Sequence, residues 1–151
     1  HLDRVVTFND DPFVMDRKTT RYTPSSRYFD QFEPDNQMSC YTLAGQILFN
    51  TPIRGVIIDC AHIMIEGTRF VRGLTYRNPD QLDEWVNDLH YWLTLAEEFA
   101  VANYWPMNDT SCDKYGGCKF RKICSKSPHV REKFLAADFN RETPWNPLEV
   151  R

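Results

Sequence analysis

The stretch of sequence that decides the fold is HLDRVVTFNDDPFVMDRKTT, residues 1–20 of a chain of 151. Residues 1–8 alternate apolar and polar side chains well enough to predict a strand, and residues 13–20 predict a second one. Between them, Asn9-Asp10-Asp11-Pro12 is typical of a turn. The stretch therefore predicts a β-hairpin at the start of the chain.

The remaining sequence predicts a helix, two strands and a long helix, expected over residues 37–49, 53–65, 68–76 and from Pro79 onward. A loop is expected over 21–33, and Pro34-Asp35-Asn36 indicates the start of the first helix. In the long helix the apolar residues recur at helical spacing, and two of them, Trp85 and Trp92, are predicted to lie in the core. A short helix over 129–139 and an irregular tail at 145–148 complete a mixed α/β fold.

Composition and charge exclude several classes of protein. The aromatic fraction is 14%, which argues for a folded domain, and the sequence holds no apolar stretch long enough to span a bilayer. We expect a cytoplasmic protein without a membrane partner. The net charge is −3, but acidic and basic residues are concentrated in different segments. Residues 78–111 contain seven acids and no Lys or Arg, whereas residues 112–133 contain seven bases and two acids. The basic segment could contact phosphates or could simply be solvated.

The hairpin carries the first candidate site. Because strand side chains alternate, Asp16 and Lys18 are expected on one face of the second strand and Arg17 on the other. If the turn pairs Phe8 with Phe13, Asp3 lies opposite Lys18 on the same face. Two carboxylates beside an ammonium could hold Mg²⁺ or Mn²⁺ for phosphodiester hydrolysis. An exposed cross-strand ion pair is the alternative.

The helix after the hairpin adds Gln37 and Tyr41, which are four residues apart and share one helical face. The order Asp3, Asp16-Arg17-Lys18, Gln37, Tyr41 resembles the RecB-like branch of the PD-(D/E)XK nucleases. The resemblance implies a restriction-endonuclease-like fold, a mixed sheet flanked by helices.

Several site roles are implied by the resemblance alone. Asp3, Asp16 and the backbone carbonyl of Arg17 would bind the metal, and Lys18 would position or activate the attacking water. Gln37 and Tyr41 would hold the site and the nucleic-acid strand. The alternative for that helix is structural, with Tyr41 packed in the core and Gln37 at its rim. The family's first helix, with a metal-binding His, is expected upstream of residue 1, so we expect the chain to be truncated.

The five cysteines fall into two kinds. Cys40 and Cys60 lie in apolar segments and are predicted to be buried. Cys112, Cys118 and Cys124 lie in the polar loop CDKYGGCKFRKIC, and thiolates in such loops hold Zn²⁺ or iron–sulfur clusters. The loop resembles the iron–sulfur loop of RecB-type nucleases, including CRISPR-associated exonucleases and phage-encoded members. The resemblance implies a 4Fe-4S cluster, with Zn²⁺ as the alternative and the fourth cysteine upstream; the first spacing departs from the family's usual Cys-x2-Cys.

These observations predict a metal-dependent DNA nuclease. The resemblance implies the exonuclease type and a bacterial or phage-infected cell. The expected parts are a nuclease core over residues 1–104 and a cysteine-cluster loop and tail over 105–151, packed on the same domain. The predicted DNA contacts are Arg21, Lys119, Arg121 and Lys122. The alternative is an inactive DNA-binding or assembly module stapled by the cluster, and a zinc-ribbon-like interaction protein is the third possibility. A helicase or recombination partner is left open.

Overall fold

The computed structural model describes residues 2–142 and 146. His1, expected to begin the first strand, lies outside these residues, as does most of the irregular tail predicted at 145–148. The chain divides into two compact units, His1–Ala102 and Asn103–Arg151. The long helices and all the described strands belong to the first unit.

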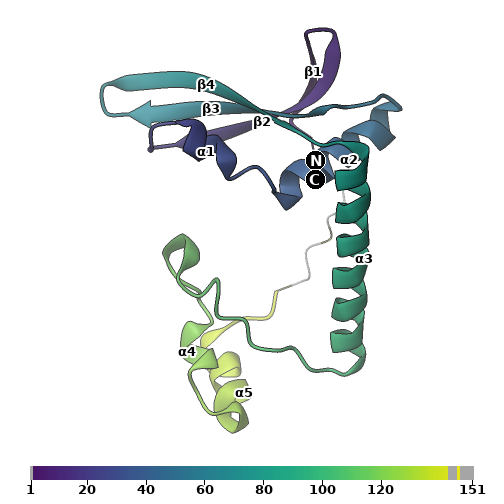
Figure 1. Ribbon diagram of the computed structural model, residues 1–151. Helices are drawn as coiled ribbons and strands as arrows, with labels where there is room; N and C mark the ends of the chain where they lie inside the picture. Colours follow the sequence, from purple (N-terminus) through teal and green to yellow (C-terminus); the bar gives the residue numbers. More distant parts are fainter. Residues whose placement is uncertain (1, 143–145, 147–151) are drawn as a thin grey trace. The chain divides into compact units, whose positions relative to one another are not determined.

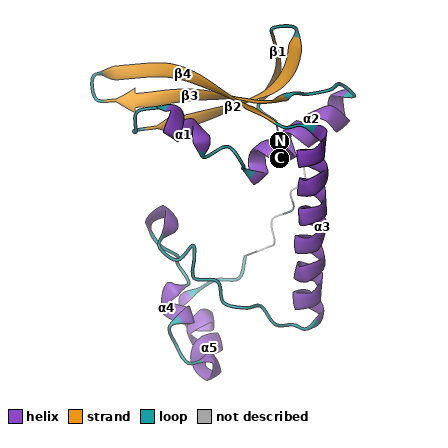
Figure 2. Ribbon diagram, viewed as in Figure 1, coloured by secondary structure: helices purple, strands orange, loops and turns teal. Residues whose placement is uncertain are grey.

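The first unit is built on a four-stranded sheet in the order β1-β2-β3-β4. The strands are β1 (Arg4–Phe8), β2 (Asp11–Thr20), β3 (Gly55–Met64) and β4 (Gly67–Tyr76). β1 and β4 pair antiparallel with their neighbours, whereas β2 and β3 are parallel. A parallel pair requires a crossover, and α1 (Ser26–Asp30) and α2 (Asn36–Phe49) form it below the sheet in Figures 1 and 2. The predicted mixed α/β fold is confirmed.

The hairpin register differs from the one expected. Phe8 pairs with Asp11, not with Phe13, and β2 therefore begins two residues earlier than predicted. The cause is a two-residue turn, since Asn9 and Asp10 both take positive φ angles of 50° and 65°, a conformation that Asn and Asp tolerate. The shift is an even number of residues, so each side chain keeps its predicted face of the sheet.

The sheet face covered by α1 and α2 carries the main core, in which Val14, Val56 and Ile58 pack against Met38 and Phe32. Phe13, Met15 and Ile57 form a smaller apolar cluster on the opposite face.

One loop prediction and two cysteine predictions had mixed outcomes. Residues 21–33 are not wholly loop, because they contain α1. Cys60 is buried as predicted, but the prediction for Cys40 is wrong, because Cys40 projects from the exposed side of α2.

The long helix α3 (Pro79–Val101) begins with the capping box of Asn78 and Gln81. Only Leu82 is buried along it. The prediction that Trp92 lies in the core is wrong, since its exposed fraction is 63%; Trp85 is half-buried and donates from Nε1 to Asn36 Oδ1 over 3.0 Å. None of the helices in the described part of the chain has the length and apolar character that crossing a membrane requires.

Within its described residues, the second unit contains three short elements: η1 (Lys114–Gly116), α4 (Arg121–Cys124) and α5 (Pro128–Asp138). Helix α5 begins and ends one residue earlier than the helix predicted over 129–139. The Phe120 and Phe139 rings stack with centroids 4.8 Å apart. Arg131 donates to the carbonyl of Cys124 over 2.9 Å, which ties α5 to the end of the cysteine loop.

Candidate active site

Strand β2 presents Asp16 and Lys18 on the face that α2 covers. Asp16 is 4% exposed, and its Oδ2 lies 2.8 Å from Lys18 Nζ. Arg17 points to the opposite face, where its Nε lies 3.5 Å from Asp59 Oδ2. The alternation predicted for this strand therefore places the carboxylate and the ammonium together and keeps Arg17 away from them.

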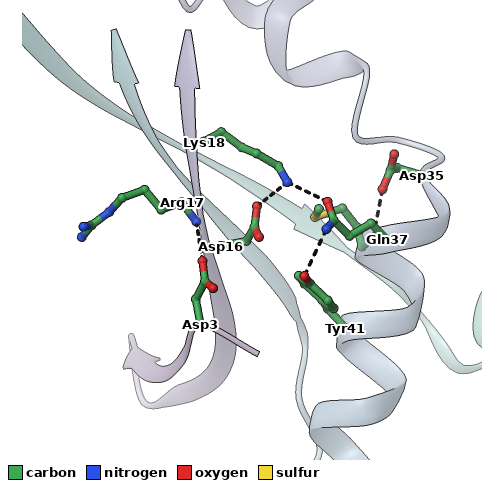
Figure 3. A network of polar contacts seen from close by, with 8 residues as sticks. Asp3, Asp16, Arg17, Lys18, Asp35, Gln37 and Tyr41 are labelled. Atoms are coloured by element: carbon green, nitrogen blue, oxygen red, sulfur yellow. Dashed lines mark hydrogen bonds and ion pairs between the residues drawn. The ribbon is translucent and has the colours of Figure 1, made fainter. Parts of the chain in front are cut away.

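Helix α2 completes a chain of polar contacts that Figure 3 shows. Lys18 Nζ donates to Gln37 Oε1 over 2.6 Å, and Gln37 Nε2 donates to the Tyr41 hydroxyl over 3.0 Å. Gln37 can make both contacts only with its carbonyl towards Lys18 and its amide nitrogen towards Tyr41. Because Tyr41 accepts through its oxygen, its own proton is left to donate to another group.

Two further residues set the position of α2. Asp35 caps the helix, and its Oδ1 accepts from the Met38 N–H over 3.0 Å. Arg77, the residue directly after β4, is 8% exposed; it donates to Ser39 Oγ over 2.9 Å and to the carbonyl of Phe32 over 2.9 Å. Sequence reasoning missed Arg77, because an Arg followed by Asn and Pro looks like a surface residue before a helix.

Asp3 approaches the same strand from the side of β1. Its Oδ2 accepts a hydrogen bond of 3.3 Å from the backbone N–H of Arg17. The register that pairs Arg4 with Met15 puts Asp3 level with Asp16, not opposite Lys18 as expected. The structure thus brings together Asp16, Lys18, Gln37 and Tyr41, and sets Asp3 beside the peptide that joins Asp16 to Arg17.

The other predicted site residues lie apart from this network. Cys112 is half-buried in the second unit, Cys118 and Cys124 are exposed, and all three are free thiols. Across the described residues, no three His, Cys, Asp or Glu side chains converge in a way that could hold a metal. The structure therefore does not bring the three loop thiols together.

The predicted DNA-binding residues are exposed in both units. In the second unit Lys119 lies over the Phe120 ring, Lys122 is solvent-accessible, and Arg121 is paired with Asp113. In the first unit Arg21 follows directly after β2.

Comparison with known families places most of the chain in one of them. A family model described as the PD-(D/E)XK nuclease superfamily matches residues 1–125. The chain belongs to this superfamily. None of the curated proteins matches the chain. The match spans all four strands, and the mixed sheet flanked by helices agrees with the fold of PD-(D/E)XK nucleases.

Membership in the PD-(D/E)XK superfamily implies a divalent metal, and the residues at β2 fit one. Asp16 Oδ2 is buried and accepts no hydrogen bond of good geometry among the described residues, although Lys18 Nζ is close. Asp3 adds a second carboxylate near the same strand. Mg²⁺ is commonly held by one or two carboxylates, with water and substrate phosphates supplying the other oxygens. The carboxylates of Asp3 and Asp16 form a donor set of the kind that binds Mg²⁺ in this way.

Proposed function

We propose that this chain is a metal-dependent nuclease of the RecB-like branch that hydrolyses phosphodiester bonds in DNA, as an exonuclease. The observation that carries the proposal is the contact chain from Asp16 through Lys18 and Gln37 to Tyr41. The superfamily match supports the reaction class. Gln37 and Tyr41, four residues apart on α2, support the RecB-like branch.

Lys18 is the residue proposed to act on the attacking water. Its ammonium carries three N–H donors; one is donated to Gln37, and the ion pair with Asp16 holds the nitrogen from a second side. An N–H that is not donated to Gln37 can hold a water or a phosphoryl oxygen. With 27% of its side chain exposed, Lys18 is within reach of solvent while its position is held from two sides.

Gln37 and Tyr41 are proposed to hold the Lys18 ammonium and the scissile phosphate in one arrangement. Gln37 fixes Lys18 through its carbonyl, and the Tyr41 hydroxyl can donate its free proton to a phosphate oxygen. Such donors are most effective when they are ordered before the substrate arrives, because the reaction then spends little free energy on reorganisation.

Asp3, Asp16 and the Arg17 carbonyl would hold Mg²⁺ or Mn²⁺. A bound divalent ion would polarise the phosphoryl oxygen and stabilise the leaving oxygen.

The test compares Asp16→Asn and Lys18→Met with the wild-type chain on end-labelled DNA in Mg²⁺ and in EDTA. We expect wild-type cleavage only with the metal, and none in either variant at an unchanged melting temperature. Asp83→Asn and Lys133→Met, which alter exposed residues, serve as matched controls and should remain active. Activity in both site variants would contradict the proposal.

The same assay addresses the mode of action and the alternative. An exonuclease should degrade linear DNA and spare circular DNA, so cutting of circles would contradict that part. Salt-sensitive DNA binding without cleavage in any divalent metal would instead favour the inactive DNA-binding or assembly module.

A 4Fe-4S cluster on Cys112, Cys118 and Cys124 is a separate part of the proposal. It rests on the resemblance of the loop to the iron–sulfur loop of RecB-type nucleases, and the described geometry offers it no support. Metal sites often form only when the metal binds, so the test is made on protein purified without oxygen. A brown protein with iron and sulfide is expected; a colourless protein with zinc would favour the alternative.

A further inference from the structure

An exposed aromatic side chain lies just beyond the end of the strand that carries Asp16 and Lys18. Tyr22 is two residues past the end of β2 and its exposed fraction is 66%. The guanidinium carbon of Arg21 lies over its ring, 5.1 Å from the centroid. Two similar pairs, on Phe120 and Phe134, belong to the second unit.

The position of this pair is held by contacts from two neighbouring strands. The Tyr22 N–H donates to Thr20 Oγ1 over 3.0 Å, which fixes the turn out of β2. His62 on β3 is 6% exposed, and its Nε2 lies 3.3 Å from the carbonyl of Arg21. Arg21 also donates from Nη2 to the Tyr22 hydroxyl over 3.0 Å. An exposed ring held in this way loses little freedom when a ligand binds.

The distance along β2 places Tyr22 near the proposed reaction site. Tyr22 is four residues from Lys18, and because β2 ends at Thr20 and the chain then bends, the span between them is below the roughly 13 Å of a fully extended chain. Nucleotides are about 3.4 Å apart along one strand of a duplex and further apart when unstacked, so this span corresponds to at most about four nucleotides. A nucleic-acid strand with a phosphate at Lys18 can therefore have a base beside Tyr22.

We propose that Tyr22, backed by Arg21, is a stacking platform for an unpaired base of a single-stranded nucleic acid. A ring with one face beside a guanidinium has its other face for a base, and only an unpaired base has a free face to offer. The guanidinium adds positive charge next to the phosphate that accompanies that base. This inference rests on the proposed function, because it concerns the strand that enters the same site, and it makes Tyr22 a determinant of substrate form.

The test measures binding in EDTA, so that it does not depend on cleavage. Fluorescence anisotropy compares a labelled oligothymidylate, an oligouridylate of the same length and a blunt duplex. Base–aromatic stacking is worth about 1–3 kcal/mol, so Tyr22→Ala should weaken binding of the single strands about 5- to 150-fold and leave the duplex unchanged. Tyr22→Phe should bind as wild type does. Tyr91→Ala, at a similarly exposed tyrosine on α3 (64%), is the matched control.

An abasic scan makes the test specific to stacking. A single abasic nucleotide is moved along the oligothymidylate; one position should weaken wild-type binding and have no further effect in Tyr22→Ala. Equal binding by Tyr22→Ala and wild type, an equal loss on the duplex, or the absence of such a coupled position would overturn the proposal. If DNA is cleaved but binding does not depend on Tyr22, only the stacking proposal is contradicted. If single strands bind through Tyr22 but are not cleaved, only the proposed nuclease function is contradicted. Comparison of the oligothymidylate with the oligouridylate shows whether DNA or RNA binds more tightly.

Discussion

The hydrogen bond between Lys18 and Gln37 allows a quantitative test of the proposed chemistry. Gln37 Oε1 is the neutral acceptor that holds the Lys18 ammonium, at 2.6 Å. Hydrogen bonds to charged groups contribute about 1.5–3 kcal/mol. If this contribution is realised in the transition state, Gln37→Leu should lower the rate of cleavage about 10- to 150-fold.

The kinetic pattern distinguishes positioning from binding. Because Gln37 contacts Lys18 and not a remote part of the substrate, the loss should fall on kcat and leave KM nearly unchanged. Gln37 is exposed, so the free energy of unfolding should change little. Steady-state cleavage of a labelled oligonucleotide at saturating Mg²⁺ measures both constants.

A matched control and a clear refutation are available. Gln31 is also exposed, and its side chain donates a hydrogen bond to the carbonyl of Tyr28 over 2.6 Å; Gln31→Leu should leave kcat unchanged. If Lys18→Met inactivates the protein but Gln37→Leu keeps the wild-type kcat, the Lys18 ammonium does not need the hydrogen bond to Gln37, and the reasoning is refuted.

Three further predictions concern the scaffold. Arg77→Met removes buried hydrogen bonds to uncharged groups and should lower the free energy of unfolding in urea by about 2–5 kcal/mol; a loss below about 0.5 kcal/mol would contradict this. A Cβ at Gly73 would lie 2.2 Å from a Phe29 ring carbon, so Gly73→Ala should lower the melting temperature, and the added change Phe29→Leu should recover part of the loss. Burial, followed by a hydrogen bond to Cys60, raises the pKa of Tyr28 from 10.0 to about 12. The stability linked to Tyr28 should therefore be complete below pH 10 and be lost as the pH rises towards 12; Tyr28→Phe should flatten this part of the stability profile, and parallel profiles would argue against it.

Sequence periodicity predicted the elements whose apolar pattern is long. The strands of the sheet, α2 and α3 were found because burial on one face imposes a repeat that can be read from the chain. The helix α1 was missed, because its five residues are too few to show a repeat. The exposure of Trp92 was missed as well, because a helical stripe predicts a buried face only where another element covers it.

The site was predictable where it depends on alternation and not where it depends on pairing. Asp16 and Lys18 share a face of β2 because strand side chains alternate, and Gln37 and Tyr41 share a face of α2 because of helical spacing. The predicted cross-strand partner of Asp3 was wrong, because the sequence Asn9-Asp10-Asp11-Pro12 is compatible with either a two-residue or a four-residue turn. The bond from Lys18 to Gln37 joins residues 19 positions apart, and only the packing of α2 on the sheet creates it.

The ion pair of Asp16 and Lys18 also bears on when the protein would load its metal. The buried carboxylate already has a resident positive charge 2.8 Å away, so a divalent ion that approaches Asp16 meets repulsion as well as attraction. A nucleic-acid phosphate lowers that barrier by bringing negative charge of its own. Before a metal binds, the Lys18 ammonium would thus neutralise the charge of the Asp16 carboxylate. Binding of the nucleic acid and binding of the divalent ion would then be cooperative.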